Sequence, residues 1–236
     1  RIMRTPIGIA VCFTSSIFLF PGTTNAANIL TVPFSVGGAA FGDLGTDGIE
    51  EIIVGSQSAP PKVAILRKDG STIFSFEPFD SSTHAGVNIA VGDIAGDSRN
   101  EIIATASFGG TPEVRIFDSR GKFLSSFSAF DKKFLGGVSL AVADINGDKQ
   151  NEIVAAAGMT GGPHIKIFRA NGELIKQFFA FDENDKAGLT IAPLDINDDG
   201  VSELVIAHYG FGAPEARIAS FVANQTTLSP PFSLYN

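Results

Sequence analysis

A nine-residue pattern of oxygen-bearing side chains recurs four times in the chain and is its strongest chemical signal. The clearest copy runs from Asp195 to Glu203, with Asp195, Asn197, Asp199 and Glu203 at positions 1, 3, 5 and 9. A tight turn directs alternate side chains inward, so positions 1, 3 and 5 can reach one ion. Ca²⁺ takes about six to eight oxygen ligands from carboxylates, amide carbonyls and backbone. The pattern therefore predicts a calcium loop.

The other three copies keep the acids but differ at position 3. The third copy has Asn146 there, whereas the first two have Gly45 and Ala95, which offer no side-chain oxygen. A simpler hypothesis leaves the metal out: the acids are solvated, or they cap the turn by accepting backbone N–H bonds. The predicted metal ligands are Asp43, Asp47, Glu51, Asp93, Asp97, Glu101, Asp144, Asn146, Asp148, Glu152, Asp195, Asn197, Asp199 and Glu203.

We expect these sites to be structural. Extracellular calcium modules bind at roughly 10⁻⁴–10⁻³ M, so about 1 mM calcium would stabilise each site by roughly 0.4–1.4 kcal/mol. Three acids in each of four loops make 12 of the 25 Asp and Glu residues, against 17 Lys and Arg. The resulting net charge of −8 argues against nucleic acid as a partner, because binding to phosphates depends on Lys and Arg.

The loops recur because the chain is a repeat of about 51 residues. The aspartates at position 1 are spaced by 50, 51 and 51 residues, and a proline recurs every 51 residues at Pro61, Pro112, Pro163 and Pro214. A period of this length is typical of solenoids, propellers and arrays. We predict repeat units at about 36–86, 87–137, 138–188 and 189–236.

Each unit contains four short runs rich in Val, Ile and Phe, separated by turn residues. Four strands per unit at this period describe a β-propeller blade. We therefore predict an all-β fold, a β-propeller of four four-stranded blades. The blades either close as a small ring with Ile29–Phe34 completing the last one, belong to a larger propeller, or close by association. In the second unit the predicted strands are Val87–Val91, Glu101–Ala106, Glu113–Phe117 and Phe123–Phe127, and Phe127, Phe130, Phe178 and Phe181 are expected to pack between blades.

The first 27 residues have the features of a secretory signal peptide. Arg1 and Arg4 precede an apolar run from Ile7 to Phe20, and small residues follow. The run is short for a membrane span, which needs about 20 residues, although an uncleaved anchor is the alternative. We expect a secreted or cell-surface protein with no membrane span after cleavage. Its single cysteine, Cys12, lies in the signal, so disulfides cannot stabilise the mature chain.

The repeat resembles FG-GAP (VCBS-type) repeats, which are related to the propeller blades of integrin α-chains. The namesake run is Phe108-Gly109-Gly110-Thr111-Pro112, with a second copy at Phe211–Pro214. Gly161-Gly162-Pro163-His164 is similar to a variant common in bacterial surface proteins. The resemblance implies calcium in the acidic loops, a propeller fold, and an extracellular or surface role.

We expect a non-enzymatic module for binding or adhesion, whose partner is an unidentified extracellular protein or glycan. An extracellular polysaccharide hydrolase or lyase, and a purely architectural spacer, are the alternatives. Catalysis would need a departure from the repeat, and the candidate bases are His84, His164 and His208. We expect the ligand at the rim formed by the loops after each second strand, and the turns with Asp80, Asp131 and Asp182 at the opposite rim. Those rim loops are Gly55–Pro61, Ser107–Pro112, Gly158–Pro163 and Tyr209–Pro214.

Overall fold

The computed structural model describes the backbone of residues 8–11, 16–20, 28–31, 34–208, 215–222 and 225–233. Every regular element in these ranges is a β-strand. Across the same ranges, no helix is long and apolar enough to span a membrane. The expected secretory signal contains two of the strands, β1 (Gly8–Val11) and β2 (Ser16–Phe20), and its cleavage stays a prediction. Cys12 lies outside the described residues.

Four sheets within the described ranges repeat the same path. In each of them, four strands follow one another in sequence order and neighbouring strands run antiparallel. Antiparallel neighbours need only short connections, which the turn-rich segments supply. The sheets contain β4 (Val36–Gly42), β5 (Glu51–Ser56), β6 (Val63–Leu66) and β7 (Thr72–Phe76); β8 (Val87–Gly92), β9 (Glu101–Ala106), β10 (Glu113–Phe117) and β11 (Phe123–Ser128); β12 (Val138–Ala143), β13 (Glu152–Ala157), β14 (His164–Phe168) and β15 (Leu174–Phe179); and β16 (Leu189–Leu194), β17 (Glu203–His208), β18 (Glu215–Val222) and β19 (Gln225–Leu228).

A tight hairpin joins the third and fourth strands of the second and third sheets. The Gly121 N–H donates to the carbonyl of Asp118, and the Gly172 N–H donates to that of Arg169. Both glycines have positive φ angles, 77° and 84°. A residue with a Cβ adopts this conformation only at a cost, so glycine suits both turns.

Apolar side chains fill the spaces between consecutive sheets and form the core. Separate clusters join the first sheet to the second, the second to the third, and the third to the fourth. Phe127 and Phe130 pack against the cluster between the second and third sheets, and Phe178 and Phe181 pack against the next cluster. The prediction that these phenylalanines lie between sheets is therefore confirmed.

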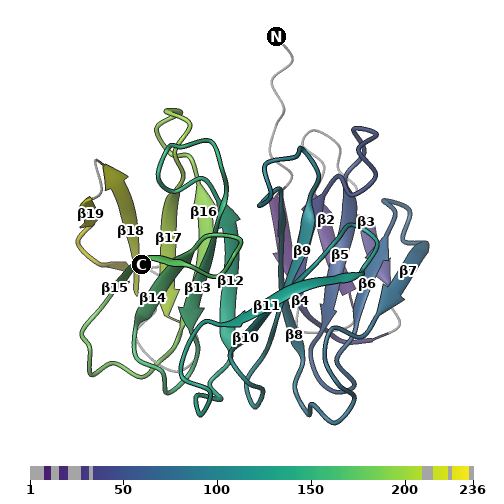
Figure 1. Ribbon diagram of the computed structural model, residues 1–236, viewed down its shortest axis with the longest axis horizontal. Coiled ribbons are helices and arrows are strands. Elements are labelled where there is room, and N and C mark those ends of the chain that lie inside the picture. The colour runs from purple at the N-terminus through teal and green to yellow at the C-terminus, as the bar shows by residue number, and fades with distance from the viewer. Residues whose placement is uncertain are drawn as a thin grey trace.

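The sheets follow one another in a propeller-like arrangement. Their first strands contact one another in chain order: β4 contacts β8, β8 contacts β12, and β12 contacts β16. Small buried residues such as Ala90 and Ala141 let these strands approach closely. Figure 1 shows the fourth sheet and the first sheet at opposite ends of the molecule. The all-β, propeller-like class agrees with the prediction from the repeat.

The sheets at the two ends of the chain differ from expectation. The strand β3 (Asn28–Thr31) pairs with β2 in a separate three-stranded sheet, so it does not complete the last blade, which was one of the three ways of closing that the sequence left open. The fourth sheet takes its outer strands from the following residues, because β19 and β20 (Phe232–Ser233) both pair with β18. Pairing between consecutive strands is the commoner solution in antiparallel sheets.

Candidate functional site

The four acidic loops (43–51, 93–101, 144–152 and 195–203) share one backbone geometry. In each loop, positions 4 and 6 have positive φ, for example 80° at Gly147 and 67° at Lys149. Glycine fills only one of the two positions in each loop, so each loop also contains a residue with a Cβ in a conformation that is costly for it. These non-glycine residues are Thr46, Ser98, Lys149 and Asp198.

The carboxylate at position 1 holds each turn together. In the third loop, Asp144 Oδ1 accepts the N–H groups of Asn146 (3.2 Å) and Gly147 (2.7 Å), and Oδ2 accepts that of Lys149 (2.8 Å). These contacts are those of a turn-capping carboxylate, the alternative that the sequence left open. The aspartates at position 1 of the other loops, Asp43, Asp93 and Asp195, also cap their turns, and they accept the N–H groups of positions 5 and 6.

The glutamate at position 9 begins the second strand of each sheet and faces back into the loop. Glu152 is only 1% exposed. Its Oε2 accepts the Ile145 N–H (3.0 Å) and its Oε1 accepts the Asn146 amide (2.6 Å). Burial, with a smaller contribution from Asp148 and Asp144 of the same loop, raises the pKa of Glu152 to about 7. Burial also raises the pKa of Glu101. A nearby cation would favour the charged form of both groups.

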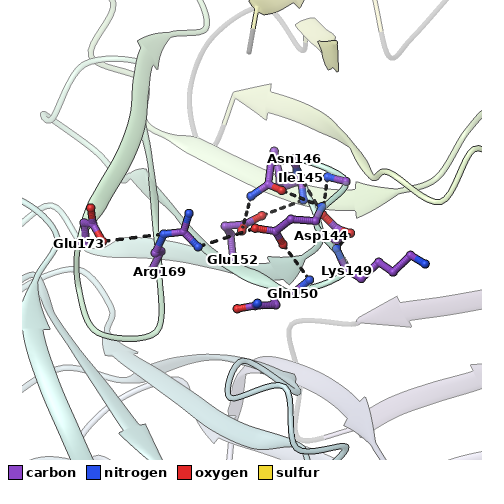
Figure 2. Close-up of polar contacts among 10 residues, drawn as sticks. Asp144, Ile145, Asn146, Lys149, Gln150, Glu152, Arg169 and Glu173 are labelled. Atoms are coloured by element: carbon purple, nitrogen blue, oxygen red, sulfur yellow. Dashed lines mark hydrogen bonds and ion pairs between the residues drawn. The ribbon is translucent and has the colours of Figure 1, made fainter. Parts of the chain in front are cut away.

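The third loop also meets the hairpin between β14 and β15. Figure 2 shows Arg169 and Glu173 on this hairpin, beside Glu152 and Asp144. Arg169 Nη1 lies 3.7 Å from Asp148 Oδ2, and its Nε lies 3.8 Å from Glu173 Oε2. These side chains are partly exposed, so each ion pair contributes little to stability. Arg169 nevertheless places a positive charge beside the carboxylates of the loop.

Hydrogen bonds tie each acidic loop to the one before it, and the sequence analysis missed the residues that make them. At position 8, Asn100 Nδ2 donates to the Asp43 carbonyl (3.0 Å) and Asn151 Nδ2 donates to the Asp93 carbonyl (2.9 Å). The fourth loop has Ser202 at position 8, and its N–H donates to the carbonyl at position 1 of the third loop. The 51-residue recurrence of asparagine at position 8 was the available signal. We call the edge formed by the four loops the acidic rim.

The donor set of the third and fourth loops suits calcium in its chemistry. Positions 1, 3, 5 and 9 all carry oxygen, the hard ligand that Ca²⁺ prefers. The pKa of Glu152 is high mainly because the group is buried, and the loop's own hydrogen bonds do not fully offset the cost of its charged form. Among the described residues, no three His, Cys, Asp or Glu side chains are gathered as a metal site. The residues that would hold the ion are Asp144, Asn146, Asp148 and Glu152, and Asp195, Asn197, Asp199 and Glu203.

A groove of about 490 Å³ lies where the first strands begin, at the opposite end from the acidic rim. The four first strands each contribute to it, together with loops that follow the second strands. No charged residue is among the described residues that line it. Its polar side chains are Gln57, Asn88, Ser107, Ser139 and Thr190, and its aromatic side chain is Phe108.

The loops around the groove confirm one expectation and correct another. The loops that follow the second strands of the first three sheets lie at the groove, as the lining residues Gln57 and Phe108 show. We expected the turns with Asp80, Asp131 and Asp182 at the opposite rim, which is wrong. The Gly109 N–H donates to the Leu135 carbonyl, so these turns share the groove rim. Four strands of alternating direction return the chain to the end where it started. Tyr209–Pro214 lies outside the described residues.

His208, one of the candidate bases, lies beside the groove in contact with a carboxylate. Its Nε2 is 2.7 Å from Asp185 Oδ2, and its ring centroid is 4.0 Å from that of Phe181. His208 pairs in register with Leu189, which lines the groove. The corresponding positions of the second and third sheets are Ala106 and Ala157, so this pair departs from the repeat.

The other two histidines have different surroundings. His164 Nε2 contacts Gln177 Oε1 at 3.1 Å, and its ring lies 4.7 Å from that of Phe179. Burial lowers the pKa of His164. These contacts are those of a packed side chain on the outer strands. His84 lies in the connection between β7 and β8.

Comparisons with known proteins identify relatives by fold only. No protein-family model matches the chain, and no curated protein matches it. A solved protein of unknown function from Bacteroides caccae is similar with a TM-score of 0.57 and 11% identity, over 97% of this chain and 72% of that one. The structure of BBS1N in complex with ARL6DN is similar with a TM-score of 0.56 and 12% identity, over 98% of this chain and 67% of that one. The exotype rhamnogalacturonan lyase YesX is similar with a TM-score of 0.51 and 15% identity, over 88% of this chain but only 49% of the lyase. At such identities the likeness shows the fold alone: an all-β, propeller-like arrangement of antiparallel sheets.

Proposed function

We propose that this protein is a secreted, non-enzymatic binding module that takes a neutral glycan in the groove. The observation that carries the proposal is the lining of the groove. Its polar side chains are amides and hydroxyls, and none of the described residues that line it is charged. Sites of this kind hold a ligand with a few polar groups on an otherwise apolar wall. A neutral sugar matches them, because it offers hydroxyl groups on its edges and C–H groups on its faces.

Phe108 is the side chain we assign to the sugar face. It lies at the groove and is 62% exposed, although a phenyl ring is ordinarily buried. Gly136 and Gly137 line the groove nearby, and their lack of side chains lets this loop pack against the backbone of Met159 and Phe108 at the rim. An aromatic ring beside backbone and amide groups gives both contact area and orientation.

Calcium in the acidic loops is the structural part of the proposal. Its support is the all-oxygen donor set, the resemblance to FG-GAP repeats, and the buried glutamates whose pKa values are raised. Calcium bound there would stabilise the rim that ties consecutive sheets together. The groove, at the other end of the same strands, would then be presented on a stiffer frame.

A glycan array followed by calorimetry tests the binding function. We expect one or more neutral oligosaccharides to bind, and Phe108→Ala to weaken that binding about tenfold or more. The matched control is Phe123→Ala, which removes a similarly exposed ring from β11. The proposal fails if no neutral glycan binds the wild-type protein, or if the two variants weaken binding equally.

Polysaccharide cleavage is the second candidate, and the His208–Asp185 contact is the observation that favours it. A carboxylate beside a histidine can hold the ring in one orientation, as a general base requires. Similarity to a rhamnogalacturonan lyase is consistent with this candidate at the level of fold. Release of unsaturated products or of new reducing ends from a polysaccharide panel, abolished by His208→Ala, would replace the binding proposal by this one.

A further inference from the structure

The groove contains a row of polar residues beside a row of aliphatic residues, and the repeat places both rows. They occupy two neighbouring positions of the first strands, aligned by the pairing of each strand with its second strand. The polar row is Asn88, Ser139 and Thr190, and the aliphatic row is Ile89, Leu140 and Ile191. The first sheet has Gly38 and Ala39 at these positions. The groove therefore presents the same pair of features once in each of three consecutive sheets.

The two rows meet over the gaps between consecutive first strands, because successive residues of a strand face opposite sides. The polar row faces the following sheet: Asn88 Nδ2 donates to the carbonyl of Val138 on β12 (2.8 Å). The aliphatic row faces the preceding sheet: Leu140 packs in the cluster between the second and third sheets. Each gap thus combines one position of the polar row with one of the aliphatic row. The three pairs are Gly38 with Ile89, Asn88 with Leu140, and Ser139 with Ile191.

We propose that the ligand of the groove is a linear chain of neutral sugars that places one sugar unit over each of the three gaps. This rests on the glycan binding proposed above and adds the length and path of the ligand. Like subsites in a row suit a ligand that itself repeats, and every unit of a linear oligosaccharide offers hydroxyl groups to one row and C–H groups to the other. The volume of about 490 Å³ is that of a pocket for a drug-sized ligand, which is larger than one sugar ring.

Phe108 marks the middle gap. Its loop follows β9 of the second sheet and meets Gly137, the residue before β12 of the third sheet. A Cβ on Gly137 would lie only 2.7 Å from the Phe108 nitrogen. A sugar chain anchored on the Phe108 ring therefore occupies the middle gap first and extends into the gaps on either side. The gap between Ser139 and Ile191 is then needed only by chains longer than two units.

Calorimetry of the full chain with sugars of increasing length tests the proposal. The probes are cello-, manno-, xylo- and galacto-oligosaccharides of one to five units. In a series that binds, we expect affinity to rise about tenfold from two units to three, and to change less than about threefold from four to five. Affinity that is complete at one or two units, or that still rises beyond four, overturns the proposal and leaves glycan binding standing. Absence of binding in every series also overturns it, whereas the glycan array decides separately whether the groove binds glycans at all.

Two variants separate a row of subsites from one undivided site. Ser139→Ala should weaken binding of the three-unit sugar about threefold or more, and leave the two-unit sugar within about twofold, because the shorter sugar can use the other two gaps. Phe108→Ala should weaken binding at every length. The matched control is Ser126→Ala, which removes an exposed hydroxyl from the outer strand β11 and should change neither affinity. Equal weakening of both lengths by Ser139→Ala would overturn the proposal.

Discussion

Asn151 Nδ2 donates a hydrogen bond to the backbone carbonyl of Asp93, across 2.9 Å and 58 residues of sequence. The bond joins the third acidic loop to the second, and it is partly buried. We expect Asn151→Ala to lower the free energy of unfolding by about 1–2 kcal/mol, because the carbonyl loses its partner. Urea denaturation measures the change. Gln150→Ala, at the adjacent exposed position, is the control and should have little effect. Equal effects would mean that the bond does not contribute.

Calcium should raise the melting temperature, and the fourth loop should contribute to that rise. Each filled site is worth roughly 0.4–1.4 kcal/mol at about 1 mM calcium, which is up to a few degrees for a chain of this size. Asp195→Asn keeps an oxygen for the backbone N–H groups but removes the charge of a ligand, so it should reduce the calcium-dependent shift. Thermal melts in calcium and in EDTA give the comparison.

Asp198→Asn is the matched control for this loop. It removes the same charge at position 4, where we assign no ligand, and asparagine accepts the positive φ of 58° found there. Its calcium-dependent shift should equal that of the wild-type protein. No shift in the wild-type protein, with calorimetry also silent, would leave the acids as turn caps alone.

Without calcium, the stability of the protein should fall as pH rises from about 4.5 to 7. The pKa of Glu152 is raised from 4.5 to about 7 in the folded state, so folding favours its protonated form. Its stabilising effect is complete below the unfolded pKa and is lost as pH rises through the folded pKa, by about 3 kcal/mol in total. Urea denaturation in EDTA at about pH 5 and pH 8 measures the loss.

Glu152→Gln should remove this pH dependence while keeping an acceptor for the Ile145 N–H. The variant should be more stable than the wild-type protein at about pH 8 in EDTA, because it places no charge in the buried site. Glu173→Gln, on the exposed hairpin, should retain the wild-type slope. A slope unchanged in Glu152→Gln would assign the pH dependence to other groups.

Replacing Ser98 by glycine should stabilise the second loop. Ser98 has a φ of 67°, a conformation that costs a residue with a Cβ about 1–2 kcal/mol. The backbone N–H that donates to Asp93 Oδ2 is kept, and the charge does not change. Part of the gain is offset because glycine is more flexible in the unfolded chain. We therefore expect denaturation experiments to show a free energy of unfolding that is higher by about 1 kcal/mol. Ser98→Ala keeps the Cβ and should be nearly neutral; a similar gain in that variant would contradict the argument.

The repeat made the strands predictable, because apolar runs and turn residues recur at fixed columns. In the second unit, the predicted strand Glu101–Ala106 has the bounds of β9. Contacts between units were harder to predict, since they depend on how neighbouring sheets align. Two such contacts between units were missed: the bond from Asn151 to Asp93, and the approach of His208 to Asp185. The misplaced turn at Asp131 had a simpler cause, because counting strand directions would have located it.

The position-8 bonds reach back by one repeat unit and no further. The second and third units therefore each supply a donor to the unit before and an acceptor to the unit after. A duplicated unit inserted in the middle of the array would bring both halves of the connection with it. Unequal recombination between repeats could thus lengthen or shorten such a protein in whole units, without any compensating change elsewhere along the acidic rim.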